Sequence, residues 1–184
     1  MTKNQKVVTG IAVAAIIIMI LTRKKIATYL NKTPFANVSN KLFNLISRLE
    51  GFVAVPYWDN KQWSVGYGSG YNWDAKRAVN KNDIIDKATA NRWLLAEAQQ
   101  EFDFVKSIVK VPVTDNQLIA LSSFSYNEGQ QALKDSTLMR ILNAGIDKQL
   151  VAREFDRWVY ADGKVNQGLV NRRAAEKQLF LTPF

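Results

Sequence analysis

The chain has 184 residues with 25 Lys and Arg, 16 Asp and Glu, and neither histidine nor cysteine, which gives a formal net charge of +9. Without histidine and cysteine there can be no Ser-His-Asp triad, imidazole metal site, thiol nucleophile, disulfide framework or zinc knuckle. Catalysis would have to use carboxylates, hydroxyls, amines or backbone groups, and a composition of 47% apolar and 22% charged residues is that of a globular domain rather than a disordered chain.

An uncharged and strongly apolar run occupies residues 7–22, with lysines before it and the basic triplet 23–25 after it. As a helix it would be about 24 Å long, less than the ~30 Å hydrocarbon core of a bilayer, so its basic flanks would have to reach the head groups. The run lacks both the small residues of a cleavage site and a polar face, which favours an uncleaved membrane anchor at residues 1–25 over a secretory signal or a buried core helix. Both flanks are basic, so the orientation in the membrane stays open.

The rest of the chain carries a milder charge, because removing residues 1–25 leaves a net charge of +4. No stripe of clustered Lys and Arg follows, and nucleic acid is therefore not an expected partner. Residues 26–39 mix apolar and polar residues without a period and predict a tether. The globular domain is then expected over residues 40–184.

The predicted elements of this domain begin with an amphipathic helix that stops at Gly51 and leaves Glu50 in its last turn. Residues 53–71 change to aromatic and β-branched types broken by glycines, which is typical of a short antiparallel hairpin or meander. Periodic apolar stretches then predict helices over residues 84–108, 115–126, 136–143, 148–159 and 170–180. The pattern is α+β, a small sheet beside a larger helical group, with a cleft expected where the two meet.

Two carboxylates and a hydroxyl stand in the aromatic-rich stretch after the first helix, at Glu50, Asp59 and Ser64. The negative end of the helix dipole and the apolar neighbours Leu49 and Phe52 are expected to disfavour the ionised form of Glu50, which suits a proton donor. Asp59 lies among polar residues and is expected to stay ionised. Two carboxyl groups in opposite protonation states are what glycoside hydrolysis requires, although spacing alone would also fit two ordinary surface acids.

This stretch resembles the bacteriophage lysozymes, a family of muramidases that includes phage endolysins. The family pattern is Glu, eight residues, Asp, five residues and Thr, followed by a Gly-x-Gly turn. Here Glu50 and Asp59 keep the first gap, only four residues separate Asp59 from Ser64, and the turn follows at residues 66–68. The resemblance continues through residues 123–129, 136–138 and 157–176, and covers roughly residues 40–181.

Two substitutions distinguish the chain from the family pattern. Ser64 replaces the usual threonine and keeps its hydroxyl group. Ser69 stands where the family commonly has histidine, a change expected to remove a structural ion pair rather than the reaction.

The resemblance implies a lysozyme-like fold and hydrolysis of the β-1,4 bond between N-acetylmuramic acid and N-acetylglucosamine in bacterial peptidoglycan, without a metal or cofactor. Glu50 would protonate the leaving oxygen, while Asp59 and Ser64 would position and activate a water molecule, with inversion. By their place in the matching motifs, the candidate glycan contacts are Tyr67, Tyr126, Asn127 and Thr137. Two alternatives remain open: a lytic transglycosylase that uses the same glutamate, and a non-catalytic wall-binding virion protein.

The anchored layout is similar to that of signal-arrest-release endolysins, whose N-terminal segment is later freed from the bilayer. Residues 16–21 are apolar enough that a stable anchor, for instance in the membrane of a lipid-containing virion, fits as well. In both cases we expect a monomeric catalytic domain on the periplasmic or cell-wall side of the membrane.

The remaining aromatic and basic residues are interpreted as structural. Phe155 and Trp158 lie at helical spacing with apolar neighbours and are expected in the core, and Trp73 and Trp93 are expected to pack rather than bind ligand. The pair at residues 172–173 is expected to form a solvated face or structural ion pairs.

Overall fold

The computed structural model describes residues 34–59 and 61–183, with side chains from Val38 onward. The predicted anchor and most of the predicted tether lie outside the described residues. Among the helices that are described, none is both long and apolar enough to cross a membrane. Val38–Phe184 form one compact unit.

The first described helix, α2 (Pro34–Glu50), begins within the predicted tether. The helix thus starts earlier than the sequence predicted, and proline at the first helical position is compatible with such a start. One face of α2 buries four apolar side chains at helical spacing, those of Val38, Leu42, Leu45 and Ile46. The helix ends at Gly51, which has a φ of 70° and donates its N–H to the carbonyl of Ser47.

A small antiparallel β region follows, as the sequence predicts. Strand β1 (Val53–Trp58) pairs with β2 (Trp63–Gly66), with an irregular register between Val53 and Tyr57. A second two-stranded ladder, β3 (Tyr71–Asn72) with β4 (Arg77–Ala78), continues beyond the predicted end of the β region.

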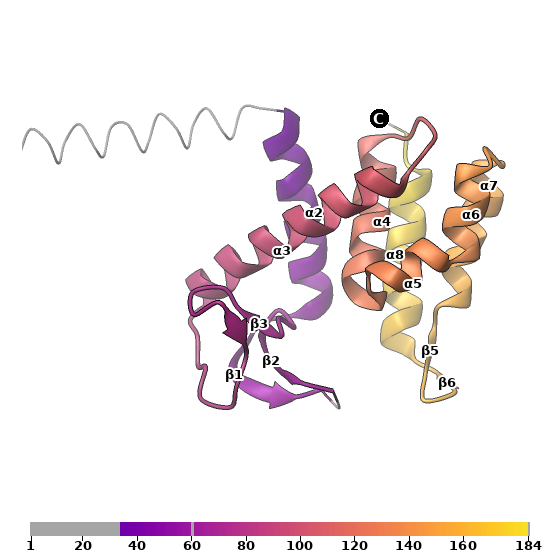
Figure 1. Ribbon diagram of the computed structural model, residues 1–184. Helices are drawn as coiled ribbons and strands as arrows, with labels where there is room; N and C mark the ends of the chain where they lie inside the picture. Colours follow the sequence, from indigo (N-terminus) through magenta and orange to yellow (C-terminus); the bar gives the residue numbers. More distant parts are fainter. Residues whose placement is uncertain (1–33, 60, 184) are drawn as a thin grey trace, which may run out of the picture. The chain divides into compact units, whose positions relative to one another are not determined.

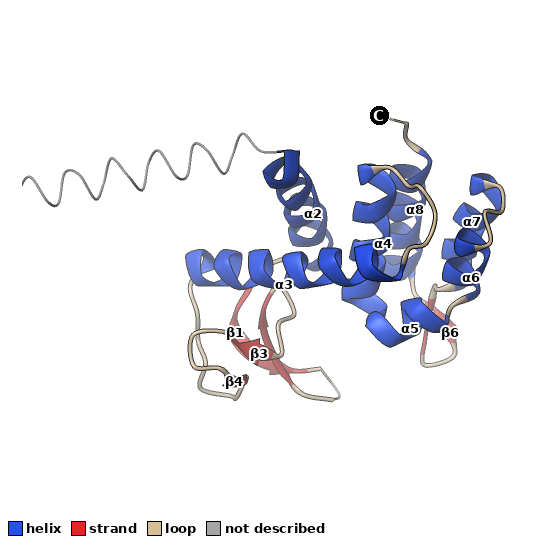
Figure 2. Ribbon diagram, turned by 45° about the horizontal axis from the view of Figure 1, so that its top comes forward, coloured by secondary structure: helices blue, strands red, loops and turns tan. Residues whose placement is uncertain are grey.

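The five predicted helices are present, with shifted ends. They are α3 (Lys87–Ile108), α4 (Asp115–Glu128), α6 (Thr137–Asn143), α7 (Lys148–Arg153) and α8 (Gln167–Leu181). Helix α3 runs from the β strands to the helical group, so one element belongs to both parts (Figures 1 and 2). Helix α4 is buried along most of its length and packs against α3 and α8.

Four further short elements were not predicted, two helical and two extended. Helix α5 (Gln130–Asp135) follows Gly129 directly, and the predicted helix over residues 148–159 ends early and passes into the 3-10 helix η1 (Glu154–Arg157). Strands β5 (Tyr160–Ala161) and β6 (Lys164–Val165) form a hairpin around Asp162 and Gly163, which both have positive φ. Asp-Gly is a common hairpin turn, but two-residue strands are too short to show alternation.

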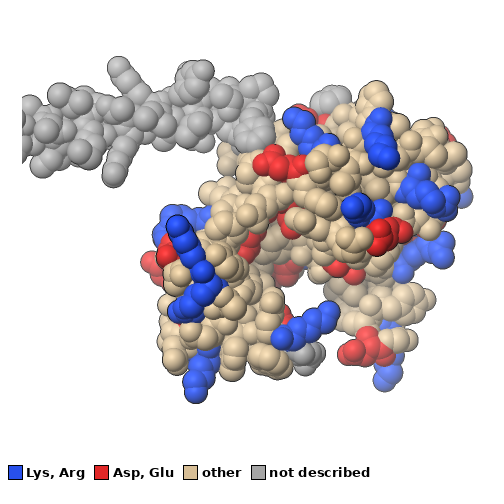
Figure 3. Space-filling model, viewed as in Figure 1, with Lys and Arg blue, Asp and Glu red and all other residues tan. Residues whose placement is uncertain are grey.

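The core confirms the structural interpretation of most aromatic residues. Phe155 is fully buried, Trp93 is 2% exposed, and Trp158 packs edge-on against Phe124. A main core cluster joins α2, α3, α4 and α8, and a smaller one of Val65, Val79 and Trp93 lies at the β region. Figure 3 shows an open notch between the small β part and the helical part, with acidic side chains on its upper wall, where the sequence predicts a cleft.

Candidate active site

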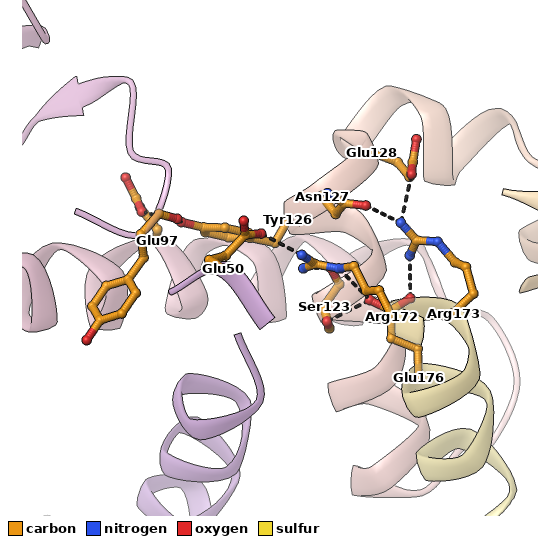
Figure 4. A network of polar contacts seen from close by, with 10 residues as sticks. Glu50, Glu97, Ser123, Tyr126, Asn127, Glu128, Arg172, Arg173 and Glu176 are labelled. Atoms are coloured by element: carbon orange, nitrogen blue, oxygen red, sulfur yellow. Dashed lines mark hydrogen bonds and ion pairs between the residues drawn. The ribbon is translucent and has the colours of Figure 1, made fainter. Parts of the chain in front are cut away.

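Glu50 ends α2 with its carboxyl group held between two parts of the fold. Its Oε1 lies 2.5 Å from Nη1 of Arg172 on α8, and its side chain is 23% exposed. Its Oε2 faces the 66–68 turn, because a Cβ added at Gly68 would lie 3.9 Å from this oxygen. The apolar surroundings predicted for Glu50 are therefore incomplete, since a guanidinium from a distant part of the chain occupies one carboxyl oxygen (Figure 4).

Arg172 is itself fixed by two further partners. Its Nε donates to Glu176 Oε1 at 3.1 Å and its Nη2 to the carbonyl of Ser123 at 3.1 Å, and only 5% of its side chain is exposed. Ser123 Oγ also donates to Glu176, at 2.7 Å. Burial raises the pKa of Glu176, and the neighbouring Arg173 and Arg172 act in the opposite direction. The guanidinium that orients Glu50 therefore belongs to a buried polar network rather than to a mobile surface chain.

Arg173 extends this network on the side of Arg172 away from Glu50 (Figure 4). It pairs with Glu176 and with Glu128, the latter at 2.7 Å, and its guanidinium lies 4.5 Å from the centre of the Phe124 ring. It also donates to the side-chain oxygen of Asn127. Of the two interpretations of the arginine pair, structural ion pairs are confirmed and a solvated face is wrong, because both side chains are buried.

Asp59 lies in the turn between β1 and β2 and accepts three hydrogen bonds. Its Oδ2 accepts from Ser64 Oγ at 2.6 Å, and its Oδ1 from the backbone N–H groups of Lys61 and Gln62 at 3.1 and 2.9 Å. The hydrogen bond from Ser64, assisted by these N–H groups, lowers the pKa of Asp59. This direction agrees with the prediction of an ionised carboxylate.

Ser64 is completely buried on β2. Although the loop before it is one residue shorter than in the family pattern, the backbone N–H of Asp59 donates to the Gln62 carbonyl at 3.0 Å and closes a tight turn. The hydroxyl therefore still reaches the carboxylate. Because Ser64 is enclosed and donates its one hydrogen to Asp59, its hydroxyl can hold the carboxylate in place.

Tyr57 was not predicted as part of the site. It is 40% exposed, lies on β1 directly across from Ser64, and has a pKa raised by burial and then by the negative charges of Glu50 and Asp59. Its hydroxyl therefore lies within electrostatic reach of both carboxyl groups. The sequence could have indicated this, because Tyr57 is two residues before Asp59 in an extended segment, and alternate residues of such a segment share a face.

The four candidate glycan contacts lie in different settings. The Tyr67 ring is 5% exposed and packs against Phe43 and Phe52, so this residue offers the glycan no open aromatic face. Tyr126 is partly buried and donates its hydroxyl to the Tyr67 carbonyl at 2.9 Å. Their roles as glycan contacts stay predictions.

Asn127 and Thr137 are both exposed. The Asn127 amide oxygen is occupied by Arg173, which leaves its NH₂ group to donate. Thr137 lines a pocket of about 280 Å³ together with Glu154, Arg157 and Trp158. Within the described part of the chain, no cluster of three or more metal-ligating side chains is present.

Comparison with known proteins places these residues in a family. The family model described as phage lysozyme matches residues 47–176, more than half of the chain. An endolysin of Bacillus phage B103 is 42% identical over 151 residues, which cover 79% of this chain and 54% of that protein, so the chain spans about half the length of this relative. A SAR-endolysin of Enterobacteria phage P21 is 33% identical over 135 residues, covering 72% of this chain and 78% of the relative.

Solved structures agree with the sequence comparison. The endolysin from Escherichia coli O157:H7 phage FAHEc1 superposes with a TM-score of 0.68 at 31% identity, covering 77% of this chain and 90% of that one. The fold is therefore lysozyme-like and α+β, as the sequence predicts. The chain belongs to the phage lysozyme family.

Proposed function

We propose that the chain is a peptidoglycan muramidase that hydrolyses the β-1,4 bond between N-acetylmuramic acid and N-acetylglucosamine. The observation that carries this proposal is a Glu50 carboxyl group oriented by Arg172 together with an Asp59 carboxylate that accepts from Ser64, both within electrostatic reach of Tyr57. Membership of the phage lysozyme family and the notch beside these residues support it.

In the proposed reaction Glu50 is the general acid. Arg172 occupies Oε1, so Oε2, which faces Gly68, is the oxygen left to carry the proton. This proton passes to the glycosidic oxygen as the bond to the sugar C1 breaks. Because the ion pair is made to the other oxygen, Arg172 fixes the direction in which Oε2 points.

Asp59, held by Ser64, activates the water on the other face of the sugar. A water molecule donates a hydrogen to the Asp59 carboxylate, whose orientation the buried Ser64 hydroxyl fixes, and its oxygen attacks C1 as the proton moves to Asp59. The reaction then leaves Glu50 ionised and Asp59 protonated, and exchange with solvent restores both. The lowered pKa of Asp59 keeps it a carboxylate between turnovers.

The nature of the product distinguishes hydrolysis from transglycosylation. A water activated by Asp59 yields reducing muramic ends, whereas attack by the muramic 6-hydroxyl yields anhydro ends. Mass spectrometry of the sugars released from purified walls tests this, and we expect reducing ends. Anhydro ends as the main product would overturn the hydrolytic mechanism, and release of no sugar fragments would favour a non-catalytic wall-binding protein.

We further propose that residues 1–25 anchor the chain in a membrane and that the lysozyme domain acts on the cell-wall side. The apolar run at residues 7–22 and the similarity to the SAR-endolysin of phage P21 support this. Fractionating cells before and after membrane depolarisation tests it, with a variant carrying Ile17→Lys as a control that should not be retained. Release after depolarisation indicates a releasable anchor, retention indicates a stable one, and a wild-type chain that is soluble throughout would contradict the proposal.

A further inference from the structure

One partly buried carboxyl group, that of Glu97, lies within hydrogen-bond distance of three neutral donors. Glu97 of α3 accepts from Ser69 Oγ and from Trp73 Nε1 on its Oε1, the latter at 3.1 Å, and from Tyr126 Oη on its Oε2, also at 3.1 Å. These donors come from the segment after the 66–68 turn, from the residue after β3, and from α4. Glu97 thus joins the β part to the helical part, and Ser69 replaces the predicted ion pair by a hydrogen bond.

The contacts around Glu97 outnumber the hydrogens available to make them. Tyr126 Oη also lies 2.9 Å from the Tyr67 carbonyl, and Ser69 Oγ also lies 2.9 Å from the Tyr71 carbonyl. Each hydroxyl has one hydrogen, so each can serve only one of its two acceptors at a time. With an ionised Glu97, the three donors can satisfy only three of the five contacts.

A proton on Glu97 removes half of this shortage, because four of the five contacts can then be made. Carried on Oε2, it is donated to Tyr126 Oη, and Tyr126 then gives its own hydrogen to the Tyr67 carbonyl. Tyr67 is the middle residue of the 66–68 turn, in which Gly66 and Gly68 have positive φ and Gly68 faces Oε2 of Glu50. The proton on Glu97 therefore determines whether Tyr126 holds the turn beside the general acid.

We propose that Glu97 works as a neutral carboxylic acid and is a positioning residue, whose proton directs the Tyr126 hydroxyl onto the Tyr67 carbonyl and fixes the turn against Glu50. This deepens the proposed function and rests on it, because the turn matters only if Glu50 is the acid. Glu97 itself touches neither substrate nor reacting atoms in this account.

The charges around Glu97 and Tyr126 support a neutral Glu97. On α3 itself the facing charge is Glu101, and none of the described ion pairs includes Glu97. Tyr126 on α4 feels the charges of Glu97, Glu50 and Arg172. On the β side the contacts are the neutral Ser69 and Trp73. Burial raises the pKa of Glu97, followed by smaller opposing effects of the three donors and a further rise from Glu101.

The sign of the pH dependence follows from this raised pKa. A carboxyl group that is harder to ionise in the fold than in the unfolded chain stabilises the fold at low pH relative to high pH. Stability is therefore lost as pH rises from the ordinary glutamate pKa through that of Glu97. Over the same range Tyr126 turns from Tyr67 to the new carboxylate, and the rate constant kcat should fall.

The test compares Glu97→Gln with Tyr126→Phe in the full chain. A glutamine amide can donate to Tyr126 and accept from Ser69 and Trp73, so it imitates the neutral acid at every pH. We expect Glu97→Gln to match the wild-type kcat at low pH and to exceed it roughly fivefold on the alkaline side, the effect of about one neutral hydrogen bond. In the Tyr126→Phe background, Glu97→Gln should give no alkaline gain.

A second readout does not depend on activity. At pH values below the alkaline fall in kcat, the infrared spectrum should contain a protonated-carboxyl band that Glu97→Gln removes, and the stability advantage of this variant should grow as pH rises. Absence of the band at every pH down to the ordinary glutamate pKa would overturn the proposal, as would a folded Glu97→Gln variant that is less active at all pH values. If the wild-type chain failed to release wall sugars while the band was present, the proposed function would fail and the neutral state of Glu97 would stand.

Discussion

Glu50 Oε1 and Arg172 Nη1 lie 2.5 Å apart although 122 residues separate them in the sequence. This ion pair links the end of the first described helix to the last one and fixes which oxygen of the general acid faces the turn. Because Arg172 also holds Glu176 and the Ser123 carbonyl, the orientation of Glu50 depends on the packing of α4 against α8.

Arg172 is therefore expected to be important for stability as well as for activity. Replacing it by glutamine leaves Glu176 with one arginine fewer in a buried setting, and loss of one partner of a buried ion pair costs about 3–5 kcal/mol. Urea unfolding should show this loss. Arg172→Lys keeps the charge but cannot bridge three acceptors, so its loss should be smaller. Equal stability of all three proteins would contradict the network.

Ser64 is expected to set the acidic limb of the activity profile. Ser64→Ala removes the hydrogen bond that lowers the pKa of Asp59 most. The pKa of Asp59 should therefore rise, and the acidic limb of the rate profile should move to higher pH. Ser64→Thr retains a hydroxyl and should leave the limb in place. A limb that stays fixed in Ser64→Ala would show that Asp59 is not the group that titrates there.

Gly68 provides a test of the turn beside Glu50. Its φ of 92° is unfavourable for alanine, so Gly68→Ala should cost about 1 kcal/mol in stability, and the displaced turn should lower activity further. Gly145 has a φ of 70° with nothing within 4 Å of an added Cβ, and Gly145→Ala is the matched control. It should lose similar stability and keep full activity, as thermal melts and clearing assays can show. Equal activity in both variants would contradict a role for the turn.

The ion pair between Asp83 and Arg77 should make stability, but not activity, depend on pH. Their side chains lie 2.7 Å apart, and the Arg77 hydrogen bonds lower the pKa of Asp83 to about 2. The stabilisation is present above the ordinary aspartate pKa and is lost as pH falls toward about 2. Because Arg77 is 45% exposed, Asp83→Asn should cost only about 1 kcal/mol at neutral pH. The difference from wild type should shrink below about pH 3, and a constant difference would contradict the assignment.

Patterns within a few residues in the sequence predicted the elements that position the carboxyl groups of Glu50 and Asp59. Helical spacing and Gly51 placed Glu50 at a helix end, and the polar surroundings of Asp59 predicted its ionised state, because both depend on neighbours within a few residues. The start of α2 at Pro34 could not be predicted, because residues 26–39 have a mixed composition without a helical period. The β5–β6 hairpin was missed because its strands are too short to show a period.

Contacts between distant segments could not be predicted from the sequence in this way. The pairing of Glu50 with Arg172, the closeness of Tyr57 to both carboxyl groups and the burial of Glu97 all depend on how α2, α3, α4 and α8 pack. Tyr67 was predicted as a glycan contact by its place in a motif. The packing of its ring against Phe43 and Phe52 could not be read from that motif, because it joins segments that are apart in the sequence.

The most direct test of the account is the clearing of purified cell-wall suspensions by wild type and Glu50→Gln. Glutamine keeps the side-chain shape and can accept from Arg172, which Glu176 still partly neutralises, so the variant should fold but have no proton to give. Asp103→Asn removes an exposed carboxylate elsewhere and is the charge-matched control. We expect clearing by wild type and by Asp103→Asn and none by a folded Glu50→Gln variant. Clearing by Glu50→Gln at the wild-type rate would contradict the assignment of Glu50 as the general acid.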